Sequence, residues 1–153
     1  GRLMAAAVPQ FGEPKPGLAY PDRPVAFGVA ERAGLIALVH VDPPEGPPRI
    51  DLPGGGIDPG ESAGEAMARE FLEESGLVVR ARAELVRADH YFENGKGERF
   101  NTRGVFFAAE VLEERPEAKV EADHELMWRE PHEALRLLSR DSHVWALVNW
   151  LRR

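Results

Sequence analysis

Short apolar runs alternate with turn-forming residues over the first two thirds of the chain. Two of these runs, residues 25–30 and 35–41, are separated by four residues, Glu31-Arg32-Ala33-Gly34. Both runs contain β-branched residues and the connection is short, so they are predicted to form a β-hairpin. Residues 42–48 contain four prolines and are predicted to be a loop, after which residues 49–52 are expected to form a short strand.

Two longer strands are predicted farther along the chain, over residues 77–92 and 102–112. The polar segment 93–98 lies between them, and its Asn94-Gly95 pair is the expected turn. Residues 125–130 have the composition of one more short strand. This part of the chain therefore adds three strands to the expected sheet.

Helices are predicted toward the C-terminal end. Pro131 suits the first position of a helix over residues 132–138, because that position needs no backbone N–H. Ser142 is the expected N-cap of the last helix. The apolar residues of that helix fall on one stripe that should dock on the sheet, namely Val144, Trp145, Leu147, Val148 and Leu151. Strands followed by helices indicate an α+β fold with helices packed on a mixed β-sheet.

The N-terminal segment differs in composition from the rest. Residues 8–24 hold five prolines and two glycines, which disfavour helix and predict an extended conformation. We therefore expect an extended Pro/Gly-rich arm over residues 1–24 and one folded domain over residues 25–153. Gly1-Arg2-Leu3, which precede Met4, are expected to be a vector remnant or a trimmed start.

Composition narrows the classes of function. The 153 residues, 43% of them hydrophobic, suit one globular domain. The net charge of −7 disfavours binding to a nucleic acid polymer through its phosphates. The absence of cysteine excludes disulfides, cysteine-bound metals and a thiol nucleophile. No apolar run approaches the roughly 20 residues that cross a bilayer, so we expect no membrane partner and a cytoplasmic location.

A helix with strong end signals is predicted between the two halves of the expected sheet. Ser62 followed three residues later by Glu65 forms a capping box, which starts a helix. Gly76 is suited to end it, because glycine adopts the left-handed conformation that closes many helices. The helix should therefore extend over about three to four turns and carry the acidic residues between Ser62 and Gly76.

Three glutamates fall close together on this predicted helix. Glu70, Glu73 and Glu74 lie within about 100° of one another, on or beside its apolar face. Like charges that are turned toward a core repel and lose hydration unless a cation compensates them. Oxygen ligands in this density suit Mg²⁺ or Mn²⁺, with substrate phosphate oxygens completing the coordination. Arg69 can pair with Glu73 or support a neighbouring carboxylate.

Residues 55–77 carry these glutamates within a longer pattern of fixed spacing. The pattern is Gly, five residues, Glu, seven residues, Arg-Glu, an apolar residue, any residue, Glu-Glu, any residue, Gly and an apolar residue. An isolated Glu-x-x-Glu-Glu is typical of a solvated helix surface. The complete pattern, however, resembles the signature of the Nudix, or MutT-like, hydrolase family. Phe71 departs from it slightly, because Ile, Leu or Val is usual at that position.

The resemblance implies an α/β/α sandwich around a mixed sheet and a metal-dependent hydrolase. Family members cleave a nucleoside diphosphate linked to a group X, with water attacking phosphorus. By this resemblance Mg²⁺ or Mn²⁺ would be held by Glu70, Glu73 and Glu74, and Arg69 would orient these side chains. Glu61 would be either an additional outer ligand or a structural acceptor. Gly55 and Gly56 would let the backbone bend close to the metal-bearing helix.

The sequence offers several candidates for the general base. The family takes it from the signature helix in some members and from a downstream loop in others. Glu121, Asp123 and Glu125 are the downstream candidates, each of which is otherwise a solvated loop charge, and Glu73 or Glu74 is a comparable candidate. His90 and His124 flank segments expected near the cleft, but a packing or surface role fits a lone histidine better.

The range of expected substrates is reduced by the family resemblance, and no separate motif in the sequence identifies the substrate. Tyr91 or Phe92 could stack on a base, although both also fit an ordinary strand tip. The proline that ADP-ribose enzymes of the family tend to carry after the signature is absent between Leu77 and Pro116. We therefore expect a nucleoside triphosphate, including oxidised nucleotides, to be cleaved to monophosphate and pyrophosphate. The alternatives are a dinucleoside polyphosphate or nucleotide sugar, and a non-catalytic nucleotide-binding module. A monomer or homodimer is expected.

Overall fold

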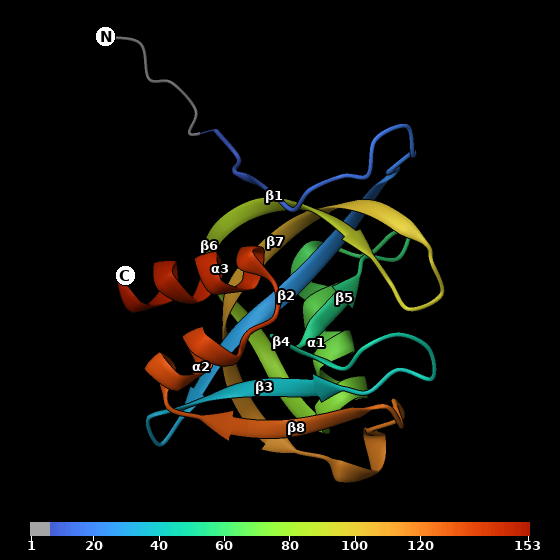
Figure 1. Cartoon of the computed structure of the whole chain (residues 1–153). Helices are drawn as coiled ribbons and strands as arrows, with labels where there is room; N and C mark the ends of the chain where they lie inside the picture. Colours follow the sequence, from blue (N-terminus) through green and yellow to red (C-terminus); the bar gives the residue numbers. More distant parts are fainter. Residues whose placement is uncertain (1–6) are drawn as a thin grey trace, which may run out of the picture.

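The computed structural model describes residues 7–153, so the expected vector remnant or trimmed start, residues 1–3, lies outside the described residues. The strands are β1 (Gln10–Phe11), β2 (Asp22–Arg32), β3 (Leu35–Val41), β4 (Arg49–Asp51), β5 (Gly54–Gly56), β6 (Leu77–Glu93), β7 (Arg99–Glu114) and β8 (His124–Arg129) (Figure 1). The helices are α1 (Ala63–Ser75), α2 (Pro131–Leu137) and α3 (Asp141–Leu151), with a 3₁₀ turn, Pro116–Ala118, before β8.

The strands form a mixed sheet centred on β2. Along most of its length β2 is parallel to β7, while β7 is antiparallel to β6 and β6 is parallel to the short β1. On its other side β2 pairs antiparallel with β5 and, through the hairpin, with β3. β3 in turn pairs antiparallel with both β4 and β8. The mixed sheet agrees with the prediction.

β2 buries side chains on both of its faces. Val25, Phe27 and Val29 belong to a core that also includes residues of α2 and α3. Ala26 and Ala30, which alternate with them, belong to a second core built against α1. Helices therefore cover both faces of the strands (Figure 1), and the predicted α/β/α sandwich is confirmed.

The expected hairpin, loop and strands are confirmed with shifts of a few residues. The hairpin turns at Ala33 and Gly34, whose φ angles of 53° and 79° match the turn type that suits twisted strands. The loop over residues 42–48 lies where it was predicted. The turn expected at Asn94-Gly95 is centred one residue later, on Gly95 and Lys96, and the Gly97 N–H donates to the Asn94 backbone oxygen at 3.0 Å. Within the described residues, none of the helices has the length and apolar character needed to cross a membrane.

The prediction for the start of α3 is wrong by two residues. Arg140 is the N-cap, and Ser142 lies inside the first turn, where its side chain is buried. Arg140 takes this position because its guanidinium is held by Asp51 at 3.1 Å, which fixes the extended backbone just before the helix. Asp141 then places a negative charge in the first turn, where the helix dipole favours it.

The segment before β2 lies along the edge of β6. Gln10 and Phe11 pair with Asp89 and His90. Gly12 has φ of 81°, and an added Cβ would lie 2.6 Å from the backbone oxygen of Tyr91, so a side chain has no room there. Asp22 to Pro24, the last residues of the expected arm, are already part of β2 and pair with β7.

Candidate active site

The helix that carries the glutamates begins and ends as predicted. Ser62 accepts a hydrogen bond from the backbone N–H of Glu65 at 3.1 Å, and Glu65 accepts one from the N–H of Ser62 at 2.9 Å. This is the complete capping box. Gly76 is left-handed, with φ of 76°, and its N–H donates to Leu72 at 2.9 Å. The ends of α1 are therefore fixed by residues within the signature itself.

The glycines before α1 bring the backbone against both β2 and α1. Gly54 has φ of 149°, and an added Cβ would lie 2.2 Å from the backbone oxygen of Ala26. At Gly55 an added Cβ would lie 2.9 Å from the carboxylate of Glu70. The two glycines are therefore required by close packing, and they leave the Glu70 carboxylate against the main chain.

Arg69 connects most of the charged residues of the signature. Its Nε and Nη2 donate to the two oxygens of Glu61 at 2.7 and 2.9 Å, and its Nη1 donates to Glu70 at 2.8 Å. A longer contact of 3.5 Å reaches Glu73, and Nη2 also donates to the backbone oxygen of Gly56. Hydrogen bonds from Arg69 and from the Asp58 N–H lower the pKa of Glu61 to about 2.

Glu70 and Glu74 of α1 are both withdrawn from solvent, and Glu74 is the more deeply buried of the two. Glu74 is 5% exposed and its Oε1 accepts a hydrogen bond from the Gly54 N–H at 3.2 Å, while Glu70 is partly buried. Burial raises the pKa of Glu74 well above its ordinary value, and neighbouring Glu70 adds to the effect. Burial also raises the pKa of Glu70, against the opposing influence of Arg69. Both carboxylates therefore lack sufficient positive charge nearby.

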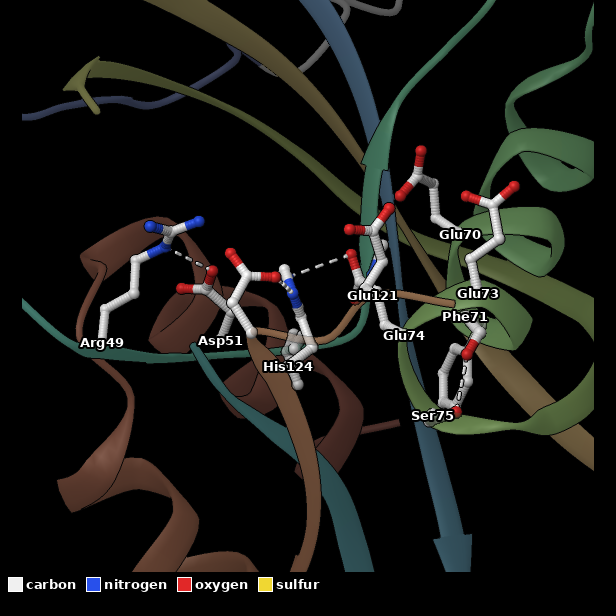
Figure 2. A network of polar contacts seen from close by, with 12 residues as sticks. Arg49, Asp51, Glu70, Phe71, Glu73, Glu74, Ser75, Glu121 and His124 are labelled. Atoms are coloured by element: carbon white, nitrogen blue, oxygen red, sulfur yellow. Dashed lines mark hydrogen bonds and ion pairs between the residues drawn. The ribbon is translucent and has the colours of Figure 1, made fainter. Parts of the chain in front are cut away.

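The loop before β8 brings further ligating groups to α1. The backbone N–H groups of Val120 and Glu121 both donate to the Glu73 backbone oxygen, at 2.9 and 3.1 Å. The His124 Nε2 lies 3.6 Å from a Glu74 oxygen, and its Nδ1 is 2.8 Å from Asp123. Figure 2 shows Glu70, Glu73 and Glu74 on α1 with Glu121 beside them, and His124 of β8 and Asp51 of β4 on the other side of Glu121.

A cavity of about 290 Å³ lies over these residues. The predicted site residues that line it are Gly55, Gly56, Glu70, Glu74, Phe92 and Glu121. The structure does not bring Glu61, Arg69, Glu73 or Tyr91 to the cavity wall. Arg69 and Glu61 lie behind Glu70, whereas Tyr91 packs edge-on against Tyr20 with ring centroids 5.3 Å apart.

The cavity is also lined by cationic side chains, which no motif in the sequence marked. Three arginines from different elements, Arg23, Arg49 and Arg140, form this arginine wall. Asp51 lies between two of them: Arg49 is 2.8 Å and Arg140 3.1 Å from its carboxylate. Burial opposes ionisation of Asp51, but the charges of Arg140 and Arg49 lower its pKa to about 2. Asp51 was visible in the sequence only as a residue ahead of the glycine loop.

Phe92 lies among these arginines. The Arg140 guanidinium is 4.5 Å and the Arg49 guanidinium 5.4 Å from the centroid of its ring. Such cation–π contacts hold the charged groups in place at the cavity wall. No local motif marks Arg23 or Arg140, because they reach the cavity only through the pairing of distant strands and the docking of α3.

The donor set suits a hard divalent cation. Glu70 and Glu74 on α1, and Glu121 in the loop before β8, offer carboxylate oxygens to one cavity, and burial raises the pKa of the first two. Mg²⁺ and Mn²⁺ prefer such oxygen ligands and would compensate the buried negative charge. A second group with ligating atoms within 4.8 Å of one another is formed by Glu121, Asp123 and His124. Glu121 is common to both groups.

Comparison with known proteins agrees with the fold and the signature. A family model described as NUDIX domain matches residues 22–151. A Bacillus subtilis (strain 168) protein described as "Putative 8-oxo-dGTP diphosphatase" is 69% identical over 38 residues, which are 25% of this chain. The match spans only 26% of that relative's length.

Solved structures resemble this chain over most of its length. A NUDIX hydrolase from Nitrosomonas europaea superposes with a TM-score of 0.72 at 19% identity, covering 86% of this chain and 89% of that one. A MutT protein from Methanosarcina mazei Go1 gives a TM-score of 0.67 at 20% identity, covering 89% and 97%. At these identities the likeness concerns the fold alone.

Proposed function

The chain belongs to the NUDIX domain family, and from this premise we propose that it hydrolyses a nucleoside diphosphate linked to a further group, with a nucleoside triphosphate as the leading substrate. One observation carries the proposal. Three glutamates, Glu70, Glu74 and Glu121, line the same cavity as three arginines. A polyphosphate bridged by a divalent cation has the charge pattern that such a cavity would bind.

The carboxylates supply the metal-binding half of the proposed site. Glu70, Glu74 and Glu121, which line the cavity, would hold Mg²⁺ or Mn²⁺, whereas Glu73, also expected as a ligand from the sequence, lies outside the cavity wall. When bound, the ion supplies positive charge that polarises the phosphate and makes water a stronger nucleophile. Arg69 orients Glu70 and Glu73 through its hydrogen bonds. Since both Glu61 oxygens accept from Arg69, Glu61 is proposed to fix that arginine rather than to be a direct ligand.

The hydrolytic step needs a group that accepts the proton of the attacking water. Water would add to a phosphorus atom of the anhydride, the P–O bond to the leaving phosphate would break, and a carboxylate would take the proton. Glu74 and Glu121 both face the cavity. Glu74 is buried and accepts the Gly54 N–H, so its carboxylate is held in one orientation, and it is proposed as the base, with Glu121 as the alternative.

The arginine wall is proposed to bind the rest of the substrate. Arg23 lies over the ring of Phe100 at 5.2 Å and beside Gly56, so it is close to the carboxylate side. Arg49 and Arg140 lie deeper, on Asp51. Arginine binds phosphate oxygens through two parallel hydrogen bonds, which orient the anhydride as well as attract it. The partner is accordingly a small-molecule nucleotide.

The description of one relative supports the choice of a triphosphate. The Bacillus subtilis relative is described by an activity on 8-oxo-dGTP and is 69% identical over its short match. An oxidised nucleoside triphosphate, cleaved to monophosphate and pyrophosphate, is therefore the first substrate to test. Dinucleoside polyphosphates and nucleotide sugars are the alternatives. A cytoplasmic location stays a prediction.

Product analysis of a substrate panel tests the proposal. The full chain would be incubated with Mg²⁺ or Mn²⁺ and with normal and oxidised triphosphates, dinucleoside polyphosphates and nucleotide sugars, and products separated by chromatography. Monophosphate and pyrophosphate should form from a triphosphate, and Glu74→Gln should reduce the rate by at least about a hundredfold. Glu117→Gln, an exposed site outside the cavity, is the matched control. A wild type that binds nucleotide but releases no product would favour the non-catalytic module.

A further inference from the structure

The segment between α2 and α3 holds the chain that leads into the glycine loop. Ile50 donates its N–H to the Ser139 hydroxyl at 2.8 Å and accepts the Ser139 N–H at 2.9 Å. Two residues later, Leu52 donates its N–H to the Nδ1 of His143 at 3.0 Å. Ser139, just before α3, and His143, in α3, thus hold residues 50–52 through hydrogen bonds, although the partners are about ninety residues apart in the sequence.

The His143 side chain that makes this contact is buried. Its side chain is 1% exposed and packs against Phe27 and Phe106, with ring centroids 4.4 and 5.4 Å away. Because Nδ1 accepts the Leu52 N–H, the neutral ring must carry its proton on Nε2. Burial lowers the pKa of His143 well below its ordinary value, which keeps the ring neutral.

The second ring nitrogen of His143, Nε2, makes no comparable contact within residues 7–153. Among the described residues, the buried Nε2 of His143 has no hydrogen-bond partner. Burying an unpaired N–H is unfavourable, and an aromatic ring without nitrogen would fill the same space without this cost. The distinctive contribution of histidine at this position is therefore its single hydrogen bond to Leu52.

Leu52 is connected to the catalytic carboxylate by two further bonds. Pro53 accepts the Gly28 N–H at 3.0 Å, which fixes the next residue to β2. Gly54 then donates its N–H to Oε1 of Glu74 at 3.2 Å. His143 holds Leu52 and β2 holds Pro53, so together they set the position in which the chain enters Gly54. Loss of the Leu52 hydrogen bond would loosen the Gly54 amide, which donates to the buried Glu74 carboxylate. His143, in α3, thus acts on Glu74, in α1, through three residues of intervening chain.

We propose that His143 is a positioning residue for Glu74: by accepting the Leu52 N–H, it holds the Gly54 amide where that amide orients the Glu74 carboxylate. The inference rests on the proposed function, in which Glu74 serves metal binding and proton transfer. His143 itself touches neither substrate nor reacting atoms in this arrangement, and its effect should appear in metal affinity and turnover rather than in nucleotide affinity.

Two substitutions separate the hydrogen bond from the packing. His143→Phe keeps an aromatic ring and removes the acceptor. His143→Asn gives up part of the ring volume and places its side-chain oxygen where Nδ1 was, so it can still accept from Leu52. We expect His143→Phe to weaken Mn²⁺ binding and to lower kcat by about tenfold, with the nucleotide KM little changed, and His143→Asn to recover most of both. Mn²⁺ affinity would be measured by electron paramagnetic resonance, and hydrogen exchange of the Leu52 and Gly54 amides by NMR.

The outcomes distinguish this inference from the proposed function. If no nucleotide is cleaved, yet His143→Phe alone weakens Mn²⁺ binding and speeds exchange at Leu52 and Gly54, the positioning role stands and the hydrolase proposal falls. Equal losses in both variants would assign His143 to packing and overturn the inference, as would a His143→Phe protein with unchanged Mn²⁺ affinity. Should that variant fail to fold, the wild-type ring decides: an NMR tautomer with the proton on Nδ1 cannot accept from Leu52 and contradicts the role.

Discussion

The guanidinium of Arg69 donates two hydrogen bonds to the Glu61 carboxylate, at 2.7 and 2.9 Å, while its remaining nitrogen donates to Glu70 at 2.8 Å. Glu61 precedes α1 and Arg69 lies in its second turn, so the pair fastens the glycine loop to the helix. The same guanidinium thereby also fixes the side chain of Glu70, which lines the cavity. Only arginine offers donors in this planar arrangement.

Replacing Arg69 by lysine should therefore reduce activity although the charge is kept. A lysine cannot reach Glu61 with two parallel bonds and also support Glu70. We expect kcat to fall by about tenfold, with a smaller change in nucleotide KM. Steady-state kinetics measure both quantities. Arg80→Lys, at an exposed pair with Glu110, should leave them unchanged, and an equally active Arg69→Lys protein would contradict the role assigned to Arg69.

Glu74→Gln should stabilise the metal-free protein while it abolishes activity. The pKa of Glu74 in the fold is raised above 4.5, so its contribution favours the fold below pH 4.5 and is lost as the pH rises through the folded value. In EDTA at pH 8 we expect a higher Tm for Glu74→Gln than for wild type, with the difference shrinking toward pH 4.5. Thermal unfolding followed by circular dichroism checks this.

Mn²⁺ should reverse that order if Glu74 is a ligand. A cation that binds only the folded state raises its stability, and the gain depends on affinity. Saturating Mn²⁺ should therefore raise the Tm of wild type more than that of Glu74→Gln, measured in the same buffer. The same Tm increase in both proteins would argue against Glu74 as a metal ligand. Glu117→Gln should behave as wild type throughout.

The buried Asp51 should support stability down to acid pH. Its pKa of about 2 lies below the ordinary 3.8, so the stability it contributes is complete above about pH 4 and is lost as the pH falls through 2. Asp51→Asn leaves the buried Arg140 uncompensated, and we expect a loss of about 3 kcal/mol at pH 7 that diminishes at pH 2. Urea unfolding measures it. Glu114→Gln, which breaks the exposed pair with Arg32, should cost less than about 1 kcal/mol.

Gly54 should tolerate no side chain. An alanine there would combine φ of 149° with a Cβ 2.2 Å from the Ala26 backbone oxygen, so β2 and β5 would have to separate. We expect a loss of more than about 2 kcal/mol in urea unfolding. Gly60→Ala is the matched control, because Gly60 has φ of 85° with open space around it and should lose only about 1 kcal/mol. Similar losses of stability in Gly54→Ala and Gly60→Ala would show that the positive φ, and not the close packing at Gly54, causes the loss.

The sequence by itself determined the parts of this protein that depend on near neighbours. Capping boxes, left-handed glycines and hairpin turns are formed by residues a few positions apart, and α1 begins at Ala63 and ends at Gly76 as its signals predicted. Apolar periodicity likewise indicated the strands and the layered fold. The signature spacing brought Glu70 and Glu74 to one face of one helix, because helical geometry alone fixes that relationship.

Only the tertiary structure decided what lies opposite those glutamates. Glu121 reaches them because its backbone binds the end of α1, and the arginine wall combines β2, β4 and the start of α3. The ion pair between Arg140 and Asp51 places the N-cap of α3 at Arg140 instead of the predicted Ser142. His143 likewise accepts a hydrogen bond from Leu52, which is far away in the sequence. These contacts join residues far apart in sequence, and they depend on strand order and helix docking, which no local pattern encodes.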